Sequence, residues 1–434
     1  MTRNRWVLAA LVALGAVGQP AAAQRPRVTL AEAIALAERV QPLVVQARGQ
    51  TRTTGARLLS ARGAYLPNLN LNANGSTFFS ESQRIDQSTG ELVTGGSRTK
   101  SVATSVSSSV ELFDGFRRSN ELGAANASDD AAAASLVDAR AQQGLQTTNT
   151  FFDALAATRL LLVREASLRR AEQQLQTSVA RLQAGAATRS DSLRSLVGVG
   201  NAQLQLITTQ AQLASAEANL GRLTGQPGRV EAVDDSSLFR IVAAIDTAAL
   251  RTEALARSPQ VQAADADQRA AGASLKASRS TYWPSLVLSG SMTLDGNDRS
   301  NYTMLTSNRL SLGLSWPLFN RFTREQTVVN QSVALDNARA SAEEARRSVV
   351  ADLISGLANL DAARLRIEIS QRSVQASQED LRVQQERYRL GVSTILDVLT
   401  TQEQLTQAEV DAVTAWFDYL RAKATIEALI GRPL

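Results

Sequence analysis

The charged and hydroxyl residues with the clearest spacing lie in two copies of one motif, Arg-x-x-x-Gly-x-x-Thr-x-x-Asp. The copies occupy 181–191 and 387–397, so every motif position recurs 206 residues later (185 to 391 for the glycine). Glycine permits the positive backbone angle of a tight chain reversal, and threonine can cap the start of a helix. These residue types predict a helical hairpin at each copy, with Asp191 and Asp397 at the start of the returning helices. They do not indicate a catalytic reaction.

The side chains that most enzymes use are missing from the sequence. It has no cysteine and no histidine, which excludes Ser-His and Cys-His nucleophiles, imidazole zinc sites, histidine-ligated haem and disulfides. Its lysines are Lys100, Lys276 and Lys423, and its acidic residues are dispersed over helical stretches. We therefore expect no enzyme activity, no cofactor and no metal site. The alternative enzyme class is an envelope hydrolase built on two buried, paired carboxylates.

The charge distribution argues against nucleic acid as a partner. The formal net charge is +5, but basic and acidic side chains are interspersed along helical stretches, as on a solvated face. Aromatic residues make up 4% of the chain, which is too few for a platform on which bases stack.

The N-terminus has the pattern of a secretory signal peptide over 1–23. Arg3 and Arg5 precede the apolar stretch 6–17, and small alanines at 21–23 suit a cleavage site. No later segment offers about 20 uninterrupted apolar residues, so no spanning helix is expected. The sequence therefore predicts an exported protein.

The chain repeats one plan over two halves, which we place at 24–228 and 229–434. Phe113 recurs as Phe319 at the same offset as the hairpin motif, and 11 extra residues fall in the first copy between Pro67 and Phe113. A repeat of about 200 residues is too long for a solenoid unit and fits two structural halves. Each half is predicted to run helix, strand, strand, long helix, long helix, which is an α+β class that is mainly α.

The helical segments begin and end at recognisable signals. Thr29 and Glu32 form a capping box that opens the first helix, and Pro42 is expected to kink it. The corresponding helix of the second half is expected to start near Asp246. No proline occurs between 116 and 184, so one helix of about 68 residues and roughly 100 Å is predicted there.

Apolar residues recur with heptad spacing in the helix after Gly185. One column comprises Leu193, Val197, Gly200, Leu204 and Ile207, and a second, spaced by seven, comprises Val199, Leu206, Leu213 and Leu220. Similar spacing follows Leu399 in the second copy. The pattern predicts coiled-coil packing along this seam.

Four segments alternate apolar residues with small polar ones, which is the period of a β-strand. The apolar positions are Leu69, Leu71 and Ala73; Val102, Val106, Val110 and Leu112; Leu286, Leu288, Met292 and Leu294; and Leu310, Leu312, Leu314 and Trp316. About ten residues of this pattern are typical of a membrane β-barrel strand, although a half-buried sheet of a soluble domain alternates in the same way. The polar stretch 80–99 is expected to be the exposed loop of the first strand hairpin.

Four strands are too few to close a barrel, since about eight is the practical minimum. An open sheet edge in lipid would leave backbone donors and acceptors without partners, at several kcal/mol each. We therefore expect the chain to pool its strands with other copies of itself.

Taken together, these features resemble the TolC-like outer-membrane efflux family. The resemblance covers nearly the whole chain after the signal segment and rests on the duplicated plan, the two hairpin motifs and four junction sequences. Those sequences are Ala64-Tyr65-Leu66-Pro67, Tyr282-Trp283-Pro284, Leu112-Phe113-Asp114-Gly115 and Pro317-Leu318-Phe319-Asn320.

The resemblance implies a homotrimer in the outer membrane. Three chains would supply twelve strands to one lipid-facing β-barrel, and their long helices would form an α-barrel in the periplasm. Such proteins are passive exit ducts of tripartite efflux or type I secretion systems. They join a periplasmic adaptor (membrane fusion) protein and an inner-membrane pump of RND, ABC or MFS type, and the pump selects drugs, metals or proteins as cargo.

By the same resemblance, the hairpin tips dock the adaptor and the inner hairpins form a gate. The docking residues would be Gly185, Thr188, Ser190, Gly391, Ser393 and Thr394. Asp397 matches the family position whose carboxylate ring lines the entrance. Tyr388 and Asp191 match a tyrosine and an aspartate that hold the closed state.

Two positions depart from the family's gate. Thr400 stands where a second acidic ring is found, and Ser393 stands where an arginine reaches the neighbouring hairpin. We therefore hypothesise a gate that is latched by Tyr388 to Asp191 and lacks one ion pair. The alternative to a duct is an exported coiled-coil scaffold whose strands form a small soluble sheet without channel activity.

Overall fold

The computed structural model describes residues 25–235, 239, 241 and 246–434, so the predicted signal peptide lies outside the described residues. The chain forms two compact units, and each unit draws on both halves of the sequence. The first unit holds the described residues of Met1–Ala37, Thr147–Phe239 and Ile369–Phe417. The second holds those of Glu38–Gln146, Arg240–Glu368 and Asp418–Leu434.

The short α-helices are α1 (Leu30–Val40), α2 (Pro42–Gly63), α5 (Thr247–Arg257) and α6 (Pro259–Ser278). Helices α1 and α5 begin at the predicted caps, whereas α2 and α6 begin at a proline. The amide of Thr29 donates to the Glu32 carboxylate at 2.9 Å, and Asp246 caps α5. Pro42 separates two helices rather than kinking one, because a proline suits the first position of a helix, where no N–H partner is needed.

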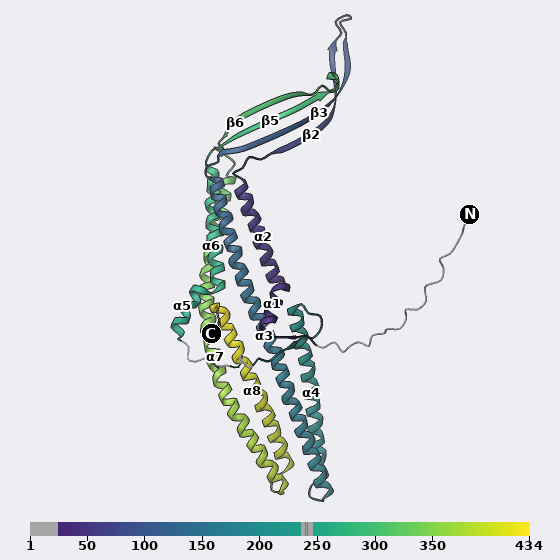
Figure 1. Cartoon of the computed structure of the whole chain (residues 1–434), viewed down its shortest axis with the longest axis vertical. Helices are drawn as coiled ribbons and strands as arrows, with labels where there is room; N and C mark the ends of the chain where they lie inside the picture. The colour runs from purple at the N-terminus through teal and green to yellow at the C-terminus, as the bar shows by residue number, and fades with distance from the viewer. Residues whose placement is uncertain (1–24, 236–238, 240, 242–245) are drawn as a thin grey trace, which may run out of the picture. The chain divides into compact units, whose positions relative to one another are not determined.

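Four antiparallel strands form one sheet of the second unit, in the order β2-β3-β5-β6 (Figure 1). They are β2 (Asn70–Ile85), β3 (Leu92–Phe113), β5 (Ser285–Asn297) and β6 (Leu305–Ser315). Val106 pairs with Leu71 on one side and Met292 on the other. Its neighbour Ser105 pairs with Thr293. Because paired residues point to the same face, the register gathers apolar side chains on one face and small polar ones on the other.

The first strand hairpin is longer than predicted. β2 and β3 stay paired as far as Ile85 and Leu92, so the prediction of a loop over 80–99 is wrong and the loop is 86–91. Every residue from 77 to 85 has an antiparallel partner, so backbone pairing continues through polar sequence. β5 pairs with β3 only from Ser101 onward, which leaves the outer hairpin as a two-stranded ribbon (Figure 1).

Each half contributes one very long helix and one shorter helix. They are α3 (Arg117–Gln183) with α4 (Arg189–Thr224), and α7 (Thr323–Arg389) with α8 (Ile395–Ile430). α3 and α7 both have 67 residues, and α4 and α8 both have 36, which confirms the predicted long helices. Among the described residues, no helix combines the length and the hydropathy that a membrane crossing needs.

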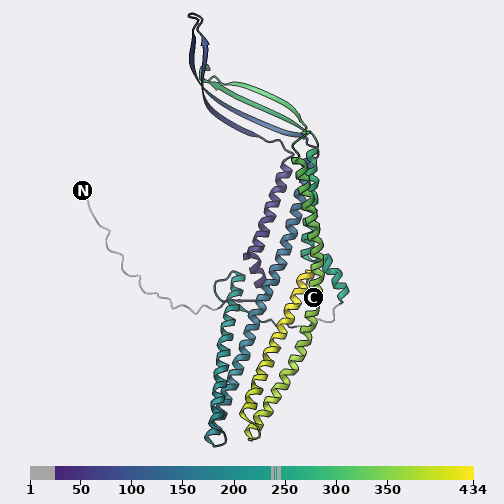
Figure 2. The ribbon, with the colours of Figure 1, turned by 180° about the vertical axis from the view of Figure 1, so that it is seen from behind.

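In the first unit the hairpins α3–α4 and α7–α8 lie side by side in both views (Figure 1, Figure 2). Arg170 of α3 pairs with Glu409 of α8 at 2.7 Å. The Phe152 and Phe417 rings pack with centroids 6.4 Å apart, and Phe239 contacts Phe417 edge-to-face at 6.1 Å. Aromatic packing and a largely buried ion pair therefore join the two hairpins.

The heptad columns of α4 divide between buried and exposed surfaces. Leu213 of the second column is 6% exposed, and Val199 and Leu220 are also buried. Val197 of the first column is 63% exposed, and Leu204 is 64% exposed. The first column is therefore left exposed in the single chain, because the chain's own helices cover only one side of α4, and its coiled-coil packing stays a prediction.

The segments that open each half are fastened to the C-terminal part of α4. β1 (Arg27–Val28) and β4 (Glu231–Ala232) pair in parallel. The Glu217 carboxylate, which is 2% exposed, accepts from Arg229 at 2.7 Å and from Arg25 at 3.4 Å. A buried carboxylate needs such partners, so this pair of contacts fixes both segments.

Candidate functional site

The two hairpin turns have the conformation that their glycines predict. The φ angles are +74° at Gly185 and +80° at Gly391, in the left-handed region that glycine adopts readily. Thr188 accepts from the Asp191 amide, and the Asp191 carboxylate accepts from the Thr188 amide at 3.0 Å, which completes a capping box. The threonine caps that the sequence predicts are therefore confirmed for α4.

The second turn has the same cap at the start of α8. The carboxylate of Asp397 accepts from the amide and the hydroxyl of Thr394, both at 2.8 Å. These two hydrogen bonds, the amide first, hold the pKa of the Asp397 carboxyl below its ordinary value. Because the folded-state pKa is lowered, this cap stabilises α8 at neutral pH and is lost as the pH falls through the lowered pKa.

Tyr388 is buried near the second turn, with 5% of its surface exposed. Its ring packs in a cluster with Leu381, Ile395, Val398 and Leu405. The guanidinium of Arg181 lies over this ring at 4.5 Å from its centroid, and it also donates to the Tyr388 carbonyl. The repeated motif arginine of one hairpin thus contacts the tyrosine of the other.

The structure does not bring Tyr388 and Asp191 together within one chain. The Tyr388 hydroxyl is buried and has no hydrogen-bond partner among the described residues. The Asp191 carboxylate is engaged in its own helix cap. Ser393, at the position of the missing arginine, donates to the Asp397 carboxylate at 3.4 Å.

A first prediction concerns the Tyr388 hydroxyl, which has no partner among the described residues. A buried hydroxyl without a partner carries a desolvation cost, so Tyr388→Phe is expected to leave stability unchanged or raise it by about 1 kcal/mol. Tyr388→Ala, the control, is expected to lower stability by about 3 kcal/mol through the cavity it creates. Thermal unfolding followed by circular dichroism measures both. A clear loss in Tyr388→Phe would show that the hydroxyl gains a partner between copies, which is the outcome that a latch to Asp191 of a neighbouring hairpin requires.

A groove of about 780 Å³ lies in the first unit between α3, α4 and α8. Arg164, Arg170 and Arg194 line it together with Glu403, and so does Ser190, one of the predicted docking residues. The other predicted docking residues lie on exposed or half-buried positions of the two turns. The groove therefore extends the exposed tip surface along the helices.

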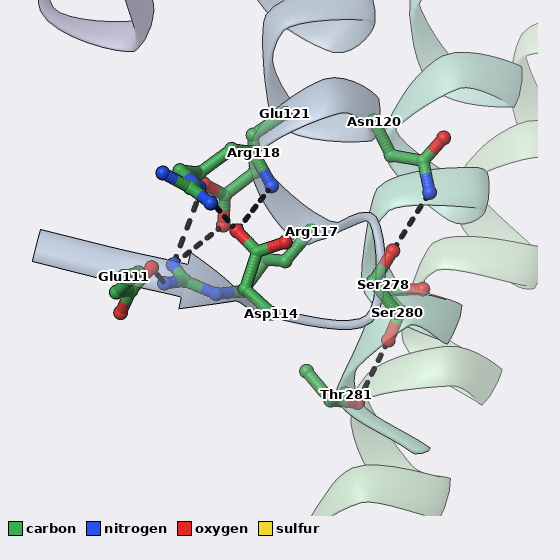
Figure 3. A network of polar contacts seen from close by, with 9 residues as sticks. All are labelled: Glu111, Asp114, Arg117, Arg118, Asn120, Glu121, Ser278, Ser280 and Thr281. Carbon is green, nitrogen blue, oxygen red and sulfur yellow. Dashed lines mark hydrogen bonds and ion pairs between the residues drawn. The ribbon is translucent and has the colours of Figure 1, made fainter. Parts of the chain in front are cut away.

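A second polar site lies in the second unit, where β3 passes into α3 (Figure 3). Asp114, 8% exposed, accepts from the amide of Arg118 at 2.9 Å and from its guanidinium at 2.8 Å. Arg117 pairs with Glu111 at 2.6 Å. Asn120 donates to the Ser280 hydroxyl at 2.8 Å, which connects the junctions of the two halves.

The turn inside this junction is closely packed. Gly115 has a φ of +66°, and a Cβ atom there would lie 2.2 Å from Cβ of Trp283. In the second half, Arg324 lies over the Tyr282 ring at 4.0 Å, and the Trp316 indole donates to the Tyr282 carbonyl at 3.3 Å. These residues hold the strands to the helices.

The sequence reasoning missed two of these features. The sequence shows Arg181 as a motif position, but its contact with Tyr388 depends on how two distant hairpins pack. Asp114 and Gly115 were quoted for a resemblance without a role. The i,i+4 spacing of Asp114 and Arg118 at a helix start was the available signal for this pair.

Comparisons with known proteins agree on one family. The family model described as outer membrane efflux protein matches residues 25–226 and 250–432. The pyoverdine export outer membrane protein OpmQ of Pseudomonas putida is 27% identical over 293 residues, which cover 65% of this chain and 60% of OpmQ. The protein CyaE of Bordetella pertussis is 25% identical over 354 residues, 77% of this chain and 71% of CyaE. The chain thus spans about 60% of the length of the pyoverdine export relative.

Solved structures with the same fold cover most of the chain. A crystal structure of CusC superposes with a TM-score of 0.79 at 17% identity, over 93% of this chain and 92% of that one. The open-state MtrE outer membrane channel of Neisseria gonorrhoeae gives a TM-score of 0.75 at 20% identity, over 93% of this chain and 89% of the MtrE chain. The chain therefore has the TolC-like fold of these channels, and these structural neighbours are channels rather than enzymes.

Proposed function

The chain belongs to the outer membrane efflux protein family, and we propose on that premise that three copies form a passive exit duct. Their twelve strands form one β-barrel in the outer membrane, and their long helices form an α-barrel in the periplasm. The duct serves a tripartite efflux or type I secretion system. It carries out no reaction of its own, and the two sequence halves, 24–228 and 229–434, act as matched structural repeats.

The observation that carries this proposal is the open four-stranded sheet. β2 and β6 are its two edges, and neither has a further partner strand among the described residues. One face of the sheet gathers most of the apolar side chains of all four strands, as a lipid-facing surface requires. Edges in lipid must be paired, so strands of further copies supply the missing partners.

The exposed column of α4 supports the same assembly. Leu193, Val197, Leu204 and Ile207 are all more than half exposed in the single chain. Large apolar side chains at heptad spacing are typical of a helix that packs against another helix. A neighbouring copy in the trimer provides that helix.

We assign the partners from the same architecture. A periplasmic adaptor docks on the hairpin tips around Gly185, Thr188, Ser190, Gly391, Ser393 and Thr394. An inner-membrane pump of RND, ABC or MFS type drives transport and selects the cargo. The relative OpmQ is named for pyoverdine export, so a siderophore of that type is one cargo to test.

The first experiment is the native mass of the particle extracted from membranes in mild detergent. A three-chain particle that conducts ions in a planar bilayer is the expected result. A monomer or dimer that stays soluble without detergent would favour the exported coiled-coil scaffold instead.

The gate hypothesis gives a second prediction, measured as conductance in a planar bilayer. If Tyr388 of one hairpin reaches Asp191 of its neighbour in the closed trimer, Tyr388→Phe and Asp191→Ala are both expected to raise the closed-state conductance. Asp191→Asn is the matched control, because it keeps an acceptor for the Thr188 amide while removing the charge. If the closed-state conductance is unchanged in both Tyr388→Phe and Asp191→Ala, the assignment of these two residues to a latch is wrong.

The ring of Asp397 carboxylates gives a third prediction. Three like charges at a narrow mouth attract cations, so Asp397→Asn is expected to lower the cation-to-anion permeability ratio several-fold. Asparagine retains an acceptor for the Thr394 amide, so the cap of α8 is preserved. Reversal potentials under a salt gradient give the ratio. An unchanged ratio would place Asp397 away from the conduction path.

A further inference from the structure

Both strand-to-helix junctions contain an unusual turn. Gly115 and Phe116 have φ angles of +66° and +65°, and Arg321 and Phe322 have +58° and +61°. Bulky residues rarely adopt this region, and such strain persists where the surroundings or the function require it. The two turns occupy equivalent positions of the two halves, so each serves as a control for the other.

The two turns differ at one position. Gly115 suits its backbone angle and packs directly against Trp283. Arg321, its equivalent, has the same kind of angle but carries a long, exposed cationic side chain. Stability alone would favour glycine at Arg321 as well. An arginine at this strained position points to a role for its charge.

Arg321 differs from the other arginines of the two strand-to-helix turns, because it has no partner among the described residues. Arg117, Arg118 and Arg324 each pair with a carboxylate. Within the described part of the chain, Arg321 takes part in no hydrogen bond or ion pair. Its guanidinium is therefore available to an external anion.

The surroundings of Arg321 identify the kind of anion. Phe319 and Phe322 flank it, 71% and 69% exposed, with their rings edge-to-face at 5.4 Å. Trp316, also exposed, continues the apolar row of Leu310, Leu312 and Leu314 on β6. Exposed aromatic rings at the end of an apolar strand face are typical of the boundary between lipid and water.

We propose that Arg321, with Phe319 and Phe322, binds the phosphate of an anionic phospholipid headgroup at the periplasmic surface of the outer membrane. The inference rests on the proposed membrane duct and adds to it a specific lipid contact. The two rings enter the boundary region, and the guanidinium forms charge-assisted hydrogen bonds with the phosphate. A net negative headgroup is favoured over a zwitterionic one because Arg321 has no carboxylate beside it.

The test compares lipid binding by the purified full-length protein in neutral detergent. Dioleoyl phosphatidylglycerol and dioleoyl phosphatidylcholine are titrated separately, and retained lipids are counted by native mass spectrometry. Wild type is expected to prefer phosphatidylglycerol. Arg321→Gly and Arg321→Gln are expected to weaken phosphatidylglycerol binding about fivefold, the effect of one cation near an anionic lipid surface.

A second readout separates this role from a structural one. Arg321→Gly is expected to raise the thermal midpoint in lipid-free detergent, because it relieves the positive-φ strain. A variant that is more stable yet binds less phosphatidylglycerol fits the proposal. An unchanged preference in both Arg321 variants would overturn it.

The control variant is Arg339→Gln, on exposed α7 surface of the same unit, where Arg339 pairs with Asp336 at 3.5 Å. Arg339→Gln is expected to keep the preference for phosphatidylglycerol. If it loses as much phosphatidylglycerol binding as the Arg321 variants do, the effect comes from overall charge and the proposed site is wrong. If inorganic phosphate raises the thermal midpoint of the wild type as much as phosphatidylglycerol does, the site binds phosphate rather than a lipid, and the proposal is overturned. The proposed duct is judged separately by trimer mass and conductance, so either idea can fail alone.

Discussion

Asp114→Ala is expected to lower the free energy of unfolding by about 3–5 kcal/mol, because it leaves a buried guanidinium without its carboxylate. The side chains of Asp114 and Arg118 are 6% and 12% exposed, so water cannot replace the lost partner. The change also removes the acceptor for the Arg118 amide at the start of α3. Denaturant unfolding in detergent, followed by circular dichroism, measures the loss.

The neighbouring ion pair supplies the control for Asp114. Arg117 and Glu111 are about one third exposed and are joined by a 2.6 Å contact. Exposed pairs contribute little, so Glu111→Gln is expected to cost less than about 1 kcal/mol. Asp114→Asn, which keeps an acceptor for the amide, is expected to fall between the two. Equal losses in Asp114→Ala and Glu111→Gln would contradict the role given to burial.

Gly115→Ala is expected to lower stability by about 3 kcal/mol, as the sum of two costs. A β-carbon at a positive φ costs about 1 kcal/mol, and the clash with Trp283 adds the cost of overpacking, about 2 kcal/mol. The same measurement on Gly185→Ala isolates the first cost, because Gly185 has a φ of +74° and open space around it. If Gly115→Ala and Gly185→Ala lower the stability equally, the close approach of Trp283 does not add to the cost of the Gly115→Ala change.

The features that could be predicted from the sequence are those set by neighbours along the chain. Gly185 and Gly391 adopt positive φ, and Thr188 and Thr394 cap the helices that follow, because a turn and a cap involve residues within a few positions. The strand alternation likewise placed Val106 on the apolar face, since side chains alternate whatever the strand pairs with. The presence of the four sheet strands and the length of α3 were predicted on the same grounds.

Most features that the sequence did not predict depend on partners that are distant along the chain. The stretch 80–99 is polar and glycine-rich and reads as a loop, yet most of it is paired because the facing strand continues alongside. The two columns of α4 have similar composition, and only packing against α3 and α8 buries one and leaves the other exposed. Tyr388 has its ring under Arg181 in this chain, while the latch to Asp191 stays a prediction about the assembled trimer.

Local sequence therefore determined the order and type of the main helices and strands, the two hairpin turns, and which face of each sheet strand is apolar. The tertiary structure decided which apolar faces are covered, which carboxylates are buried, and that Arg321 has no partner among the described residues. Asp114 and Arg321 illustrate the difference, because both stand in equivalent junction sequences and only one is enclosed by its surroundings. Burial and pairing depend on groups brought together from distant parts of the chain, and the order of residues alone does not specify those groups.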